Sequence, residues 1–152
     1  MEWFSQLLHN PFLICPVTSW LFAQLLKVAI NAFLTKKLDW ERLVGDGGMP
    51  SGHSATVSAL AMTALLCCGP GSFEFAVCAV LAIIVCHDAM GVRLETGKQA
   101  QMLNEIIRTV EVLTKQDLPE VKLKELVGHT PVQVLAGITI GVCWGTLFHF
   151  IL

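Results

Sequence analysis

Four long apolar stretches dominate the pattern of hydrophobic and polar positions along the chain. Lys27 is the only charged residue between Glu2 and Lys36, and residues 54–73 and 130–152 contain no charged residue. A helix needs about 20 mostly apolar residues to cross the hydrocarbon core of a bilayer. The pattern therefore predicts an all-α, polytopic membrane helical bundle with about four transmembrane helices, at residues 12–34, 51–68, 73–90 and 131–152.

Shorter elements are expected beside these spans. Residues 1–10 combine aromatic and polar side chains, which predicts a short interfacial segment. Residues 98–115 separate apolar from charged side chains at helical spacing, which predicts a cytoplasmic amphipathic helix that covers the bundle. Asp117 is typical of a helix N-cap and Gly128 of a helix end, so a further helix is expected between them. Thr130 is expected to cap the last span.

Composition supports a membrane protein and narrows the class. Of the 152 residues, 54% are hydrophobic and only 14% are charged, whereas a soluble domain is about 25% charged. This length is enough for a single domain, residues 1–152. The net charge of −2 argues against a nucleic-acid partner. The six cysteines lie in or at the ends of apolar stretches and are interpreted as small hydrophobic residues.

Basic residues predict how the chain lies in the membrane. Lysine and arginine are concentrated in residues 35–50 and 91–130, while the connector at residues 69–72 is uncharged. Because basic loops tend to stay in the cytoplasm, these two regions are expected there, with both termini outside. An integral, multi-pass protein of this topology brings three polar sequences to its cytoplasmic face.

The first polar sequence runs from Gly47 to Ser54 and leads into the second span. Glycine lets a backbone approach a ligand closely, and Pro50 is suited to a first helical turn. The N–H groups and dipole of a helix start favour an anion such as phosphate, and His53 could donate a proton there. A simple turn before a helix is the alternative interpretation.

The second and third polar sequences also lie at the ends of predicted spans. His87-Asp88 and Arg93 end the third span, where an ion pair is the simplest explanation and two ligands are too few for a metal site. His129 lies between Gly128 and the last span, beside the positive end of a helix dipole. Two histidines at two helix starts on one membrane face suggest a site.

These sequences resemble one known family. Gly-Gly-Met-Pro-Ser-Gly-His-Ser-Ala at 47–55, Asp-Ala-Met-Gly-Val-Arg at 88–93 and Leu-Val-Gly-His-Thr-Pro-Val-Gln-Val at 126–134 are similar to the divergent branch of the phosphatidic acid phosphatase type 2 and vanadium-dependent haloperoxidase superfamily. The similarity covers nearly the whole chain, with the motifs in order. It extends to Gly97, Gln99, Ala100 and Asn104.

The resemblance implies hydrolysis of a phosphomonoester or pyrophosphate through a phosphohistidine, without a metal or other cofactor. It implies that His129 is the nucleophile and that His53 is the general acid. Ser51 and Gly52 then belong to the loop that holds the phosphoryl oxygens. Gln99, Asn104 and Gln133 are expected to support the site.

The chain also departs from the superfamily pattern. A first motif Lys-x6-Arg-Pro is absent, because Lys36 and Arg42 are one residue too close and no proline follows. Lys122-Leu123 replaces a Ser-Arg pair, and Gln133 replaces an acidic residue. Either other residues take over these functions or the hydrolase activity is weak or lost.

Replacements for these residues are present. Lys27 lies on a polar stripe of the first span and is a candidate phosphate cation, with snorkelling to the membrane surface as the alternative. Arg93 is a candidate bidentate phosphate ligand, and Asp88 is a candidate to orient His129.

The favoured function is a membrane phosphatase acting on a lipid phosphate or an isoprenoid (pyro)phosphate. A non-catalytic phospholipid- or phosphate-binding membrane protein is the alternative, and a small transporter is a third option. The expected partners are the phosphorylated lipid and membrane lipids. A face of small residues on the last span permits close helix packing, either within the chain or in a homo-oligomer, at Gly137, Gly141 and Gly145.

Overall fold

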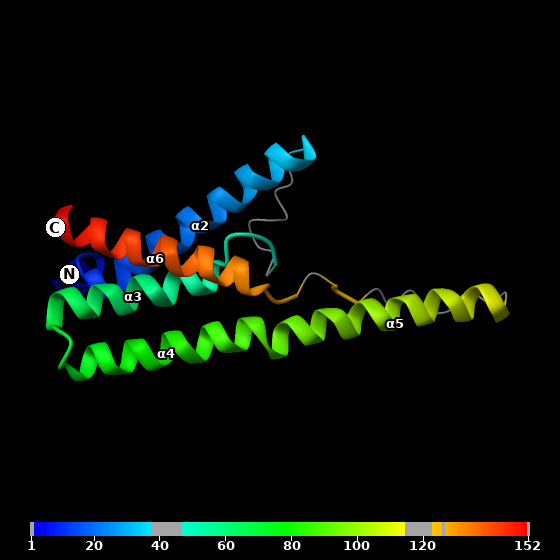
Figure 1. Cartoon of the computed structure of the whole chain (residues 1–152). Coiled ribbons are helices and arrows are strands. Elements are labelled where there is room, and N and C mark those ends of the chain that lie inside the picture. Colours follow the sequence, from blue (N-terminus) through cyan, green and yellow to red (C-terminus); the bar gives the residue numbers. More distant parts are fainter. Residues whose placement is uncertain (1, 38–46, 115–122, 126, 152) are drawn as a thin grey trace.

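The computed structural model describes residues 2–37, 47–114, 123–125 and 127–151, and these residues contain helices and no strand (Figure 1). The helices are α1 (Glu2–Leu8), α2 (Pro11–Thr35), α3 (Gly52–Cys68), α4 (Phe73–Met90), α5 (Val92–Thr114) and α6 (Pro131–Ile151). The prediction of an all-α membrane bundle is confirmed. The expected interfacial segment corresponds to α1, which has no buried residue.

Three helical stretches are long and apolar enough to cross a membrane. They are α2, α6 and the near-continuous rod of α4 and α5, Phe73–Thr114. The fourth expected span, α3, has 17 residues, which gives a helix of about 25 Å, shorter than the roughly 30 Å hydrocarbon core. In the described part of the chain there are therefore three apolar helical stretches long enough to span a membrane and one shorter apolar helix.

The short helix α3 lies at the centre of the bundle and packs against α2, α4 and α6. Its contact with α6 depends on the three glycines, all of which are buried. A Cβ atom on Gly137 would overlap the carbonyl oxygen of Ser51, and one on Gly141 would overlap that of Ala55. The small-residue face of α6 is thus used within the chain. A homo-oligomer through these glycines would require α6 to leave α3.

Helix α5 differs from the prediction for residues 98–115. It begins earlier, at Val92, and extends beyond the bundle as a continuation of α4 (Figure 1). Among the described helices it contacts only α4, so the expectation that it covers the bundle was wrong. The two helices are joined at Gly91 with little change of direction, which carries α5 away from α2, α3 and α6.

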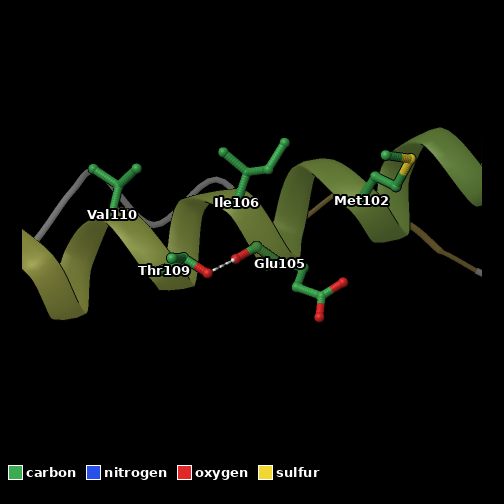
Figure 2. A pocket seen from close by; sticks show the side chains of 5 residues that line it. All are labelled: Met102, Glu105, Ile106, Thr109 and Val110. Atoms are coloured by element: carbon green, nitrogen blue, oxygen red, sulfur yellow. Dashed lines mark hydrogen bonds between the residues drawn. The ribbon is translucent and has the colours of Figure 1, made fainter.

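The apolar face of α5 remains exposed. Figure 2 shows Met102, Ile106 and Val110 in one row along the helix, with Glu105 and Thr109 completing a shallow hollow. The Thr109 hydroxyl donates to the Glu105 carbonyl within the helix, at 2.9 Å. Among the described residues that line this hollow, Glu105 is the only titratable one, and we assign the hollow no chemistry.

Candidate functional site

The three polar sequences meet at one end of the bundle. The Ser51 N–H donates to the Gln133 carbonyl at 3.1 Å, which joins the start of α3 to the start of α6. The His129 N–H donates to the Ala89 carbonyl at 3.0 Å, which joins the same region to the end of α4. Figure 1 places the two chain termini at the opposite end.

His53 and His129, which are far apart in the sequence, face each other in this region. Their ring centroids are 6.2 Å apart and the ring planes are inclined by 61°. His129 is only 1% exposed, whereas His53 is half-buried. A reacting atom must lie about 3–3.5 Å from the group that attacks it, so one small group between the rings can be reached by both.

The His129 ring is buried without strong partners. Neither ring nitrogen has a hydrogen-bond partner of ordinary geometry among the described residues. Burial, followed by the nearby charge of Lys27, lowers the pKa of His129, and His53 adds to this effect. The Gln133 side chain and the Gly48 backbone lie near enough to offset the lowering in part. The imidazole is therefore neutral at neutral pH and retains the lone pair that a nucleophile needs.

Lys27 enters the site from α2. The residue is only 3% exposed, so its side chain is buried within the bundle. The alternative, in which this side chain snorkels to the surface, is not observed. Its electrostatic effect on His129 shows that the cation lies near the imidazole. Gln24, one turn earlier on the same helix face, is also buried. Buried ionisable groups in membrane helices usually mark functional sites.

Helix α3 begins at Gly52, two residues later than the expected first turn at Pro50. Ser51 is the N-cap and is fully buried. Its Oγ atom accepts hydrogen bonds from the N–H and the hydroxyl of Ser54, at 3.3 and 3.0 Å. The hydroxyl proton of Ser51 can still be donated to a ligand, and the first N–H groups of a helix have no carbonyl partner within that helix. However, the Ser51 N–H is occupied by Gln133.

Helix α6 begins with a capping box, as the Thr130-Pro131 pair predicts. The Thr130 N–H donates to the Gln133 Oε1 atom at 3.1 Å, and the Gln133 N–H donates to the Thr130 Oγ1 atom at 3.4 Å. Threonine followed three residues later by glutamine is a favoured sequence for this motif. Gln133 therefore fixes the backbone that carries His129, in addition to lying beside its ring.

The segment before His129 lies against α5, and the expected helix ending at Gly128 is not formed there. Residues 115–122 and 126, including Asp117, lie outside the described residues, and residues 123–125 and 127 are not helical. Asn104 replaces the helical hydrogen bonds: its Nδ2 donates to the Leu123 carbonyl at 2.9 Å, and its Oδ1 accepts from the Leu123 N–H at 3.1 Å. The Asn104 Nδ2 also donates to the Glu125 carboxylate at 2.7 Å.

Two glycines allow this close approach. A Cβ atom on Gly97 of α5 would lie 2.6 Å from the Val127 carbonyl oxygen. Gly128 has a φ of 83° and its missing side chain would overlap the backbone of Leu94. Helix α5 is therefore the support of the segment that carries His129, a role that its amphipathic sequence pattern did not predict.

Asp88 and Arg93 form an ion pair with each other instead of contacting the histidines. The Arg93 Nε atom lies 2.6 Å from the Asp88 Oδ2 atom, and both side chains are more than 40% exposed. Asp88 does not hydrogen-bond the ring of His129, so the expectation that it orients this ring was wrong. Gln99 is exposed on α5 and lines neither of the openings described next.

Two openings flank the histidine pair. An apolar groove is lined by Val17, Trp20, His53, Thr56, Val57 and Val85. A more polar pocket lies between α5 and the start of α6, and its lining includes Gly48, Lys98, Glu125, Thr130 and Gln133. Sequence reasoning missed the groove residues. The signal was present, because Val17 and Trp20 continue the helix face that carries Gln24 and Lys27.

Within the described part of the chain, no group of three or more His, Cys, Asp or Glu side chains is arranged so that it could hold a metal ion. The residues gathered at the histidine pair are instead a hydroxyl, an amide and an ammonium group, from Ser51, Gln133 and Lys27. These are hydrogen-bond donors and a positive charge, which suit a phosphoryl group.

Similarity to known proteins identifies the family of the chain. Residues 8–144 match the family model described as the "Divergent PAP2 family". The "Uncharacterized membrane protein YuiD" of Bacillus subtilis (strain 168) is 39% identical over 146 residues, an alignment that covers 90% of this chain and 92% of that protein. No solved structure matches. The chain is thus a membrane protein that belongs to the divergent branch of the phosphatidic acid phosphatase type 2 family.

Proposed function

We propose that the protein is a membrane phosphatase that hydrolyses a lipid phosphate or an isoprenoid (pyro)phosphate through a phosphohistidine. The observation that carries this proposal is the His53–His129 pair, with ring centroids 6.2 Å apart and His129 buried beside Lys27. Membership of a phosphatase-related family supports it.

The chemistry follows from the different environments of the two rings. The neutral His129 attacks phosphorus with its lone pair while the bond from phosphorus to the leaving oxygen breaks. His53 gives its proton to that oxygen, so the alcohol or phosphate leaves without a full negative charge. A water molecule then attacks the phosphohistidine, gives a proton back to His53 and releases phosphate. Lys27 and the Ser51 hydroxyl stabilise the negative charge on the phosphoryl oxygens.

We also propose that the site faces the cytoplasm. Basic residues follow the ends of α2 and α4, at Lys36, Lys37, Arg93 and Lys98, whereas the turn between α3 and α4 at residues 69–72 has no charge. Cysteines placed at Gly71 and Lys98 in a variant without native cysteines test this orientation. An impermeant thiol reagent added outside should label the first position, and labelling of Lys98→Cys from outside would reverse the topology.

The activity is tested by phosphate release from detergent-solubilised protein with a panel of lipid phosphates. The His129→Ala variant should release no phosphate and should form no phosphorylated protein in a rapid quench with ³²P-labelled substrate. His149→Ala is the matched control, because His149 lies in the last turn of α6, away from the site. Full activity of His129→Ala would eliminate the phosphohistidine mechanism.

A non-catalytic phosphate-binding protein is the second candidate. The observation that favours it is that the Ser51 N–H, one donor of the expected anion loop, is already bonded to Gln133. This function predicts that the wild type binds lipid phosphates but releases no phosphate from any of them. Single-turnover release that depends on His129 would exclude it.

A further inference from the structure

An apolar groove runs along the membrane-embedded helices and ends at one histidine. It has a volume of about 340 Å³ and is lined by Val17 and Trp20 of α2, His53, Thr56 and Val57 of α3, and Val85 of α4. We infer that this groove holds a single apolar chain of the substrate, attached to the leaving oxygen that His53 protonates. The inference rests on the proposed function and specifies its substrate as a single-chain lipid phosphate.

The position of the groove relative to the two histidines identifies the part of the substrate that it would hold. The groove is lined by His53 and not by His129. A second, more polar opening of about 170 Å³ lies between α5 and the segment that carries His129, and its lining includes Thr130 and Gln133. In an in-line transfer, the leaving oxygen lies next to the acid and opposite the nucleophile. The group carried by that oxygen therefore extends into the apolar groove.

The groove opens toward lipid rather than toward water. Its outer walls belong to α2 and α4, both of which lie in membrane-spanning stretches, and Val17 is 50% exposed. A chain that is already dissolved in the bilayer can enter from the side without crossing an aqueous phase. Because lipid tails are as apolar as these side chains, the groove adds orientation more than affinity.

The size of the groove favours one chain over two. Its volume is near the lower end of the range for ligand pockets, about 300–1,000 Å³. Trp20 limits it on one side, where the indole packs so closely that a Cβ atom on Gly52 would lie 3.2 Å from it. We therefore expect isoprenyl or monoalkyl phosphates to be preferred over two-chain phosphatidic acid.

The first experiment fills the groove and compares substrates. Val17→Trp adds a large side chain at its half-exposed wall, and Val80→Trp makes the same change on the exposed surface of α4, outside the groove. For decyl phosphate, kcat/KM should fall about tenfold or more in Val17→Trp, as is typical when a hydrophobic pocket no longer fits. For ethyl phosphate, which has no chain to place in the groove, it should not fall. The Val80→Trp variant should keep wild-type values for both substrates.

An equal loss for both substrates in Val17→Trp, or no loss for either, would overturn the groove as a chain site while leaving the phosphatase proposal intact. Equal kcat/KM of the wild type for decyl phosphate and dioctanoyl phosphatidic acid would overturn the preference for one chain.

A second measurement does not depend on turnover. Decyl phosphate with a diazirine at the end of its chain, irradiated with wild-type protein in lipid vesicles, should label groove residues such as Val17 and Val57. Excess decyl phosphate should suppress this labelling and decanol should not. Labelling that decyl phosphate suppresses, without any phosphate release, would support the groove as a chain site and contradict the phosphatase function. Labelling spread over exposed α4 residues such as Val80 and Ile84 would overturn the groove.

Discussion

The two histidines of the site lie in walls of opposite character. His129 is buried among polar groups, with Lys27 and Gln133 beside it and a polar opening next to it. His53 is half-buried and lines a groove whose other residues are almost all apolar. One imidazole is thus kept neutral by burial and a neighbouring cation, while the other lines an apolar groove.

This difference shows how one residue type can serve two functions. A nucleophile must be unprotonated, and a buried histidine near an ammonium group loses its proton more easily than an exposed histidine. An acid must contact the leaving group, and the leaving group of a lipid phosphate carries the apolar chain. The environments of the two rings therefore support the proposed roles of His129 as nucleophile and His53 as acid.

The strongest test of this assignment changes the leaving group. With a monoalkyl phosphate, His53→Ala should lower kcat by about 10²–10⁴-fold, the range for a missing general acid. With p-nitrophenyl phosphate, whose leaving oxygen needs no proton, the loss should be less than about tenfold. His129→Ala should abolish turnover of both substrates, and His87→Ala, which changes an exposed histidine, should leave both rates unchanged. A similar loss with both leaving groups in His53→Ala would remove the distinction between the rings.

Lys27 is the next largest contributor that we expect. A hydrogen bond to a charged group contributes about 1.5–3 kcal/mol, so Lys27→Met should reduce kcat/KM about ten- to a hundredfold. Lys27→Arg, which keeps the charge, should lose less. If Lys27→Met folds normally and retains full activity, the cation lies too far from the phosphoryl group to act on it.

The Lys27→Met variant should also change the pH dependence of kcat/KM. Burial and then Lys27 lower the pKa of His129, and His53 is the other titratable group facing it, while Asp88 and Arg93 are paired at the surface. Removing the cation raises this pKa, so more of the nucleophile is protonated at a given acidic pH. The acidic limb of the kcat/KM profile should move to higher pH in Lys27→Met. Movement to lower pH would contradict the electrostatic role.

Two substitutions of Gln133 separate its role in the capping box from its electrostatic effect on His129. Gln133→Glu can keep the capping box with Thr130, whereas Gln133→Ala loses it, at a cost of about 0.5–2 kcal/mol of stability. Thermal unfolding in detergent should therefore show a lower Tm only for the alanine variant. The new carboxylate of Gln133→Glu should raise the pKa of His129 and shift its acidic limb upward. Equal Tm values for the two variants would show that the capping box contributes little.

The smallest effects are expected at the Asp88–Arg93 ion pair. An exposed salt bridge contributes about 0–1 kcal/mol, so Asp88→Asn and Arg93→Lys should change kcat/KM by less than about fivefold. Steady-state kinetics with one lipid phosphate is sufficient for this comparison. A loss of about a hundredfold in kcat/KM in either variant would show that the substituted residue contributes to the phosphate site.

The sequence predicted the apolar helices well and the elements around His129 poorly. Long apolar stretches with few or no charges identify α2, α4 and α6, because a bilayer requires them. The start of α6 was also predictable, since Thr130 and Pro131 act locally. The described residues before His129 were misassigned because the N–H and carbonyl of Leu123 bond to the side chain of Asn104, 19 residues earlier in the chain, instead of to helical partners.

Of the candidate site residues, the sequence alone could identify His53 and His129 as a pair only through two polar helix starts and a family resemblance. By itself it determined a multi-pass helical protein, because charge-free stretches and small-residue spacing act through local properties of the chain. Tertiary structure alone decided that Lys27 is buried beside His129, that Asp88 and Arg93 pair with each other, and that Val17 and Trp20 form a groove with His53. The physical reason is that the direction of a side chain depends on which helix faces meet, and those faces meet only when α3 packs between α2, α4 and α6.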